Sequence, residues 1–173
     1  VLASMTAEVM TEALAESSEG AVATSALETV LALRHDVIIC GPGLGRGPGV
    51  ASFVRGLLDR STIPLVLDAD ALTVLGDDPS VLEGRVERPL IITPHAGEMA
   101  RLLGMTVDDV QMNRIQVATD FAATRSLYVV LKGHRTIIAT PDGHVYINPT
   151  GNAGMATGGT GDVLAGMVAA WLA

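Results

Sequence analysis

Apolar residues recur along this chain in short runs of strand length, separated by segments of helical spacing. The runs lie at residues 36–40, 65–69, 90–93 and 128–132. Successive residues within them are apolar, which is typical of strands that are covered on both faces of a sheet. Helical spacing of apolar residues occupies 50–60, 97–103 and 107–125. The alternation predicts an α/β fold with a mainly parallel central sheet flanked by helices.

The pattern changes after the fourth run. Residues 135–149 hold two short apolar segments on either side of Pro141, Asp142 and Gly143. Proline presets φ and glycine permits a positive φ, so this stretch predicts a tight turn and an antiparallel hairpin. No repeat or linker divides the sequence, and a single domain over residues 1–173 is expected. Because the chain starts at Val1 and stops inside a helical pattern, we expect it to be truncated at both ends.

Composition narrows the classes of partner. The chain is 49% hydrophobic and 17% charged, which is typical of a compact globular protein. Its net charge of -8 argues against nucleic acids and anionic membrane surfaces as partners. No apolar run reaches the roughly 18 residues that span a bilayer. Cys40 is the one cysteine, expected to be a buried thiol at a strand end, and we expect a soluble cytoplasmic protein.

The candidate chemistry follows the predicted strands. Ligands of parallel α/β sheets bind beyond the carboxyl ends of the strands. Each run here leads into polar or glycine-rich sequence at that end, so the four ends are expected to line one rim. Those sequences are "GPGLGRGPG" (41–49), Asp70, Pro94 with His95 and Glu98, and Gly133.

Two glycine loops differ in how much they indicate. The loop at 41–49 has neither the Rossmann spacing nor a Walker Gly-Lys-Ser or Gly-Lys-Thr. It is compatible with a ligand loop and with a plain connector. The second loop, "GGTGD" at 158–162, runs into an apolar helical segment. Backbone N–H groups at a helix start form an anion site without a positive side chain, which suits an acidic protein that binds phosphate.

Asp162 admits two interpretations. Aspartate is a good helix N-cap, yet capping does not require Gly158, Gly159 and Gly161 beside it. A carboxylate next to an anion site also suits a general base that activates a hydroxyl for phosphoryl transfer.

Other rim residues carry weaker signals. His95 and Glu98 are either a surface histidine and a first-turn acid, or a substrate contact and a metal or water ligand. Lys132, the single lysine, stands at a strand end where it can meet a phosphate. Asp68 and Asp70 resemble a carboxylate pair, but alternate strand residues face opposite sides, so only one of them is expected to face the rim.

At these motifs the sequence resembles the ADP- or ATP-dependent NAD(P)H-hydrate dehydratases of the ribokinase-like superfamily. The resemblance runs in order through "GPGLG", "LDADAL", "TPHAGEMARLL", "LKGHRTIIATPDG" and "NPTGNAGMATGGTGDVLAGMVAAWLA". It implies a ribokinase-like fold whose N-terminal part is missing from this chain. It also implies repair of hydrated NADH and NADPH (NADHX and NADPHX), by phosphorylation of the ring hydroxyl and elimination of phosphate.

The same resemblance implies roles for individual residues. Asp162 is the implied base, and Gly45, His95 and Asp162 are the implied hydrate-binding positions. The implied nucleotide-binding positions are Lys132, Gly133, His134, Arg135, Thr136 and Gly161. The implied anion hole is Gly159, Thr160 and Gly161. ADP or ATP is the implied phosphoryl donor with Mg²⁺, and Glu98 is the candidate metal ligand.

The family further implies a homo-oligomer, commonly a tetramer, and a hydrate epimerase that is either fused or separate. Two alternatives stay open. One is a kinase of a small vitamin-precursor alcohol, although such relatives typically carry Asn where this chain has His95. The other is a nucleotide-binding module without catalysis, which does not explain Asp162.

Overall fold

A six-stranded sheet organises the protein, whose computed structural model describes residues 9–173. The strands lie side by side in chain order, β1 to β6. β1 to β4 are parallel, and β5 and β6 are antiparallel. Their bounds are β1 Ile38–Cys40, β2 Leu65–Leu67, β3 Leu90–Ile92, β4 Tyr128–Leu131, β5 Ile137–Ala139 and β6 Val145–Ile147. The predicted parallel sheet and the terminal hairpin are both confirmed.

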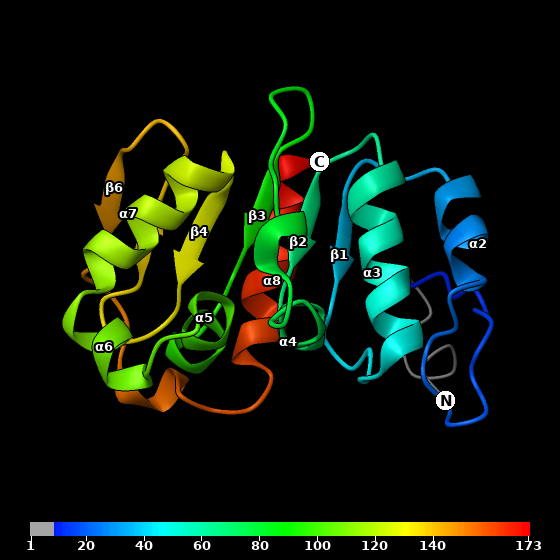
Figure 1. Ribbon diagram of the computed structural model, residues 1–173, viewed down its shortest axis with the longest axis horizontal. Coiled ribbons are helices and arrows are strands. Elements are labelled where there is room, and N and C mark those ends of the chain that lie inside the picture. The colour runs from blue at the N-terminus through cyan, green and yellow to red at the C-terminus, as the bar shows by residue number, and fades with distance from the viewer. Residues whose placement is uncertain (1–8) are drawn as a thin grey trace.

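Helices cover the two faces of the sheet unequally. Figure 1 shows α3, α4, α5 and α7 on one face, α8 on the other, and α2 beside α3 at the edge. The helices are α2 Ala26–Ala32, α3 Pro48–Arg60, α4 Asp70–Val74, α5 Ala96–Leu103, α6 Val107–Met112, α7 Arg114–Arg125 and α8 Thr160–Leu172, with 3-10 turns η1 Pro79–Val81 and η2 Ala153–Met155.

The single helix predicted over 107–125 is wrong, because two helices meet at Asn113. Asn113 has φ -123° and ψ 29°, outside helical geometry. Its side-chain amide donates to the Asp109 carbonyl at 3.1 Å. Asparagine side chains compete in this way for backbone groups and so interrupt helices. The break places Arg114 at the start of α7, where its side chain reaches the end of β4.

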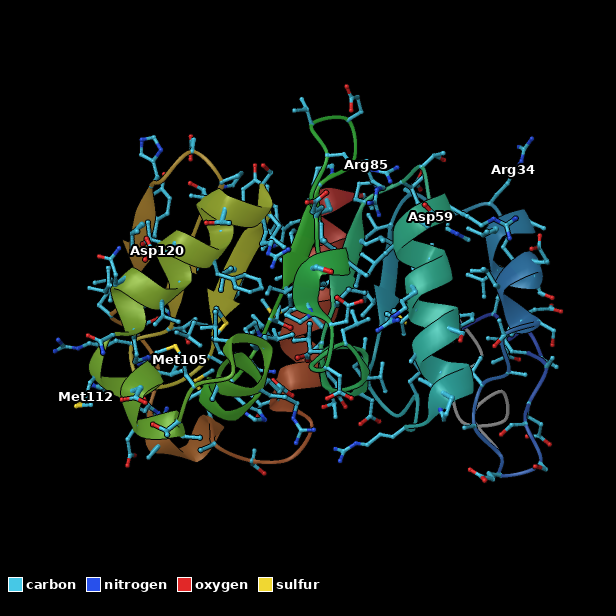
Figure 2. The ribbon with its side chains drawn as sticks, viewed as in Figure 1. Arg34, Asp59, Arg85, Met105, Met112 and Asp120 are labelled. Carbon is cyan, nitrogen blue, oxygen red and sulfur yellow. The ribbon has the colours of Figure 1, made fainter. Side chains whose placement is uncertain are left out.

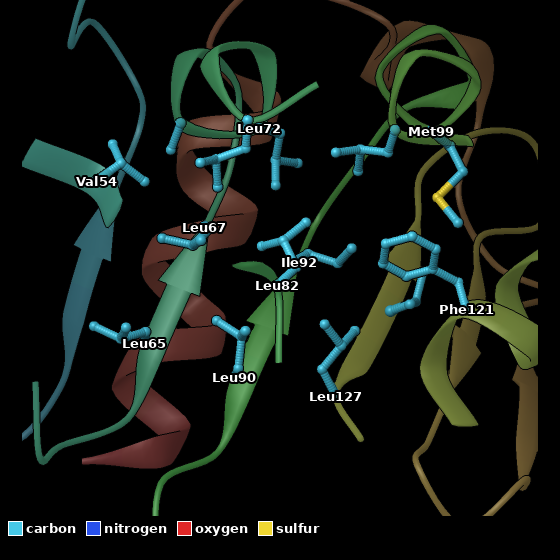
Figure 3. Close-up of a cluster of buried hydrophobic side chains, with 14 of the residues drawn as sticks. Val54, Leu65, Leu67, Leu72, Leu82, Leu90, Ile92, Met99, Phe121 and Leu127 are labelled. Carbon is cyan, nitrogen blue, oxygen red and sulfur yellow. The ribbon is translucent and has the colours of Figure 1, made fainter. Parts of the chain in front are cut away.

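The main core lies between the sheet and α3, α4, α5 and α7. Figure 3 shows Leu65, Leu67, Leu90 and Ile92 of the central strands projecting into it, toward side chains of the helices. These four side chains are fully buried. Each such leucine or isoleucine contributes about 1.5–3 kcal/mol by leaving water. This packing fixes the strands whose carboxyl ends carry the candidate site.

The opposite face is less completely covered. Val66, Ile91 and Val130 pack against Ala165 and Ala169 of α8. The small alanines let α8 lie close to the sheet. At β1, however, Ile39 stays 40% exposed. The expectation of strands covered on both faces therefore holds for β2 and β3 but is wrong at β1.

Cys40 confirms the expected buried thiol at the end of β1. It is 5% exposed, and burial raises its pKa to about 12. A thiol of that pKa carries almost no thiolate at neutral pH and is not a nucleophile. Within residues 9–173, none of the helices has the length and apolar character that crossing a membrane requires.

Candidate active site at the carboxyl edge of the sheet

The carboxyl ends of β1 to β4 form one continuous rim. Backbone hydrogen bonds continue between neighbouring chains just past the strand ends. Asp68 donates to Cys40, Thr93 to Leu67, and Lys132 to the carbonyl of Pro94, at 3.1, 3.1 and 2.8 Å. In Figure 1 the loops after these strands and the start of α8 lie at the same edge. The predicted rim is confirmed, and its backbone is fixed by these bonds.

The second glycine loop leads directly into α8. Gly159 is the N-cap, with φ +87°, a conformation that glycine adopts without strain. The first helical hydrogen bond runs from Val163 to the Gly159 carbonyl at 3.0 Å. The N–H groups of Gly161 and Asp162 precede it and so point out of the helix start, where they favour an anion.

Asp162 does not cap this helix. It lies in the first turn of α8, its side chain makes no cap hydrogen bond, and it is exposed. Among residues 9–173, no side chain forms a hydrogen bond or ion pair with its carboxylate. The capping interpretation is therefore wrong, and the carboxylate is available beside the amides of the helix start.

Lys132 lies beside that helix start. Its ammonium is 2.6 Å from Asp68 Oδ1 and 3.9 Å from Glu98 Oε2. A Cβ placed on Gly161 would lie 3.5 Å from both Lys132 Nζ and Asp68 Oδ2. Lys132 and Asp68 therefore lie at ordinary van der Waals distance from position 161, at the start of α8. The structure brings together Lys132, Gly161, Asp68 and Glu98, three of which belong to the predicted set.

His95 and Glu98 form a capping box at the start of α5. His95 Nδ1 accepts from the N–H groups of Gly97 and Glu98 at 3.0 and 3.2 Å. Glu98 Oε2 accepts from the His95 N–H at 2.8 Å, and Oε1 lies 3.3 Å from His95 Nε2. Because Nδ1 is used as an acceptor, Nε2 is the ring nitrogen that faces Glu98. Glu98 is therefore already held by His95 and Lys132, and its predicted metal role stays a prediction.

Asp68 and Asp70 both reach the rim, so the expectation that only one of them faces it is wrong. β2 ends at Leu67, before either aspartate, so the alternation of strand side chains no longer applies. Asp68 pairs with Lys132, whereas Asp70 begins α4 and accepts from the Gly45 N–H at 3.1 Å. The backbone between them turns at Ala69, which has φ +48°.

The side chain of Arg114, which the sequence analysis does not predict as a site residue, supports the turn after β4 through its backbone carbonyls. Its guanidinium donates to the carbonyls of His134, Leu131 and Lys132, at 2.6, 3.1 and 3.4 Å. Gly133 has φ +145°, which side chains with a Cβ rarely adopt, and a Cβ there would lie 3.0 Å from Arg114 Nη2. Burial lowers the pKa of Arg114, yet the guanidinium stays charged at neutral pH. Arg114 thus fixes the backbone of the predicted nucleotide segment.

Two of the predicted nucleotide-binding residues face a different part of the surface. His134 and Arg135 line a hollow of about 530 Å³ together with the α6–α7 junction. Arg135 has φ +54°, and Thr136 donates to the Gly133 carbonyl at 3.1 Å, so the turn is tight. Of the segment 132–136, Lys132 is the residue whose side chain the structure brings to the start of α8.

A family model described as NAD(P)H-hydrate dehydratase matches residues 1–173. The chain belongs to this family. A bifunctional NAD(P)H-hydrate repair enzyme Nnr from Moorella thermoacetica is 49% identical over 171 residues, which are 98% of this chain and 32% of that protein. An ADP-dependent (S)-NAD(P)H-hydrate dehydratase from Neisseria meningitidis is 45% identical over 147 residues, 83% of this chain and 50% of its own length.

Solved structures of similar proteins have the same fold. The ADP/ATP-dependent NAD(P)H-hydrate dehydratase from Bacillus subtilis, co-crystallised with ATP and Mg²⁺, matches with a TM-score of 0.69 at 39% identity. The match covers 82% of this chain and 49% of that one. A ribokinase-like superfamily protein from Enterococcus faecalis matches with a TM-score of 0.67 at 31% identity, over 86% of this chain and 49% of its own. The chain thus spans a third to a half of the length of these relatives.

Proposed function

We propose that the protein carrying this chain dehydrates hydrated NADH and NADPH with ADP or ATP as phosphoryl donor. The observation that carries the proposal is the Asp162 carboxylate, which has no side-chain partner within residues 9–173 and stands at a helix start beside Lys132. Such a site offers both a base and an anion hole for a moving phosphoryl group. The names of the Neisseria and Bacillus relatives support the choice of hydrate and nucleotide.

In the proposed reaction Asp162 takes the proton of the ring hydroxyl of the hydrate. The hydroxyl oxygen then attacks the terminal phosphorus of the nucleotide, and the bond from that phosphorus to the bridging oxygen breaks. The amides of Gly159, Thr160 and Gly161 are proposed to hold the moving phosphoryl group. Loss of phosphate, with a ring proton, restores the double bond of the nicotinamide. Phosphate leaves more readily than hydroxide, which explains the need for a nucleotide.

The neighbouring residues are proposed to form two groups, one that binds the hydrate and one that binds the nucleotide. Gly45 and His95 hold the hydrate, while Lys132, Gly161 and the backbone of the turn at 133–136 hold the nucleotide. Lys132 stands between the two groups, since it contacts Asp68 and Glu98 and lies beside Gly161. The positive charge of its ammonium thereby offsets the negative charges of Asp68 and Glu98, which would otherwise repel a negatively charged ligand.

Mg²⁺ is proposed to come with the nucleotide. Within residues 9–173, no group of three His, Cys, Asp or Glu side chains is arranged to hold a metal ion. Phosphoryl-transfer sites commonly hold Mg²⁺ through the phosphates and one or two carboxylates. Glu98 remains the predicted carboxylate ligand, although its Oε2 already accepts from the His95 N–H and lies 3.9 Å from Lys132 Nζ, and no step is assigned to the metal.

The proposal extends to the assembly of the protein. We propose a homo-oligomer that acts in the cytoplasm, together with a hydrate epimerase. The word "bifunctional" in the name of the Moorella relative supports a second activity on the same polypeptide.

An absorbance assay tests the proposed function. The full-length protein is incubated with Mg²⁺, ADP or ATP and the hydrate of NADH or NADPH. We expect the nicotinamide absorbance to return in proportion to the hydrate consumed, with one phosphate released for each ring restored. Phosphorylation of a pyrimidine or pyridoxine alcohol without any recovery of that absorbance would favour the kinase instead.

Arg114→Lys is expected to weaken nucleotide binding. In Arg114 two guanidinium nitrogens share the three carbonyls, and the single nitrogen of a lysine does not reproduce that planar fork, so the turn at 132–135 loses part of its support. We expect the Kd for ADP to rise about tenfold, since hydrogen bonds from a charged group are each worth about 1.5–3 kcal/mol. Isothermal titration calorimetry measures it, and Arg34→Lys, at the other side of the molecule (Figure 2), is the control. An unchanged Kd would contradict a role for Arg114 in holding this turn.

A further inference from the structure

The segment Asp68-Ala69-Asp70 connects the two halves of the site. We call them the nucleotide half, around Lys132 and Gly161, and the hydrate half, around Gly45. The backbone of the segment is held on both sides, because Asp68 donates to the Cys40 carbonyl and accepts from the Ala71 N–H, both at 3.1 Å. Between the aspartates, Ala69 has φ +48° and ψ -118°. A residue with a Cβ is strained there by about 1–3 kcal/mol, and such strain persists only where the surroundings enforce it. The strained residue is therefore fixed by its neighbours.

Asp68 faces the nucleotide half. Its carboxylate is 1% exposed and pairs with Lys132 at 2.6 Å. The same pair lies within 3.5 Å of the space that a Cβ on Gly161 would fill. A flexible lysine side chain is thereby held at one place beside the start of α8.

Asp70 faces the hydrate half. Its Oδ2 accepts from the Gly45 N–H at 3.1 Å and its Oδ1 from Arg46 Nε at 3.0 Å. Gly43, Gly45 and Gly47 in this loop all have positive φ, a conformation that glycine adopts readily. The loop also packs tightly on the segment, since a Cβ on Gly41 would lie 1.7 Å from the Asp68 carbonyl oxygen.

We propose that Asp68 and Asp70 are positioning residues for the two ligands, and that the turn at Ala69 directs both carboxylates to one rim. Asp68 orients Lys132 toward the nucleotide. Asp70 orients the loop around Gly45 toward the hydrate. This inference rests on the proposed function for the identity of the ligands, but not for the contacts themselves.

Two single substitutions in the full-length protein test the division of roles. Asp70→Ala is expected to raise the KM for the hydrate about tenfold, because the Gly45 and Arg46 bonds to a charged group are lost. The KM for ADP stays within about threefold. Asp68→Asn is expected to do the reverse, raising the KM for ADP about tenfold by removing the charge that holds Lys132. Two KM values that rise together in both variants would overturn the division.

A readout without turnover separates this inference from the proposed function. Hydrogen exchange of the peptide over 41–47 is expected to rise at least fivefold in Asp70→Ala, and that over 132–136 to do so in Asp68→Asn. If these changes occur but the wild type restores no nicotinamide, the proposed function fails and the positioning stands. If neither peptide changes, the positioning fails. Asp70→Asn, which keeps one acceptor, replaces Asp70→Ala if the latter does not fold.

Substitutions of Ala69 test the turn itself. Ala69→Gly removes the strain, so both KM values are expected to stay within about threefold of the wild type. Ala69→Val adds a β-branched side chain at positive φ, so the turn must shift, and both KM values are expected to rise. An Ala69→Val protein with two unchanged KM values would show that the turn does not set the two carboxylates. Asp59→Asn, at the far end of α3 (Figure 2), is the matched control for loss of a carboxylate.

Discussion

Asp162→Asn is expected to lower the turnover of the hydrate by about three orders of magnitude, within the ~10²–10⁴ range that a general base supplies. The amide is nearly the same size as the carboxylate but does not accept the hydroxyl proton. Because the Asp162 side chain makes no hydrogen bond within residues 9–173, its replacement leaves the fold intact. The Kd for ADP is expected to stay equal or to fall, since a negative charge beside the phosphates is removed.

Two measurements check this expectation. Single-turnover recovery of the nicotinamide absorbance measures the chemical step, and calorimetry measures the Kd for ADP. Asp59→Asn is the control, because it removes the same charge from the far end of α3. Turnover within tenfold of the wild type would contradict the assignment of Asp162 as the base. Loss of ADP binding in the variant would show a binding role in its place.

The rim is predictable from sequence because the spacing of apolar residues and glycines determines where the strands end and where the last helix begins. Apolar runs located the strands within two residues, and glycines upstream of Asp162 located the helix start. Parallel strands then bring their carboxyl ends together, so Lys132 and the loops were expected at one edge. Of the two interpretations of Asp162, the helix cap is wrong for a local reason, since Gly159, which tolerates a positive φ, takes the cap position.

The remaining features depended on geometry that no short pattern encodes. The two-residue period of a strand does not extend to Asp68 and Asp70, because β2 ends at Leu67 and Ala69 adopts a strained conformation. Arg114 carried no signal, because its partners lie 17 to 20 residues away and are backbone carbonyls. Only the break at Asn113 places it there. The supports of a site are therefore harder to predict from sequence than its chemical groups.

Lys132→Met is expected to destabilise the protein by about 3 kcal/mol, since it leaves the buried Asp68 carboxylate unpaired. It is also expected to abolish detectable turnover, because the nucleotide loses the ammonium beside Gly161. Asp68 is 1% exposed and has its ammonium partner at 2.6 Å. Methionine keeps the volume but not the charge. The free energy of unfolding is measured with urea, and hydrate turnover is measured on the same protein. A matched control is Arg60→Met, whose pairing with Glu28 is exposed to solvent and contributes little to stability.

The double variant Asp68→Asn with Lys132→Met separates stability from function. Removing both charges leaves no unpaired buried ion, so at least half of the lost free energy of unfolding is expected to return. Turnover is not expected to return, because the nucleotide still lacks the ammonium beside Gly161. If Lys132→Met alone unfolds at the same urea concentration as the wild type, the pair between Asp68 and Lys132 does not stabilise the fold. If the double variant regains turnover, Lys132 acts in folding and does not contact the nucleotide.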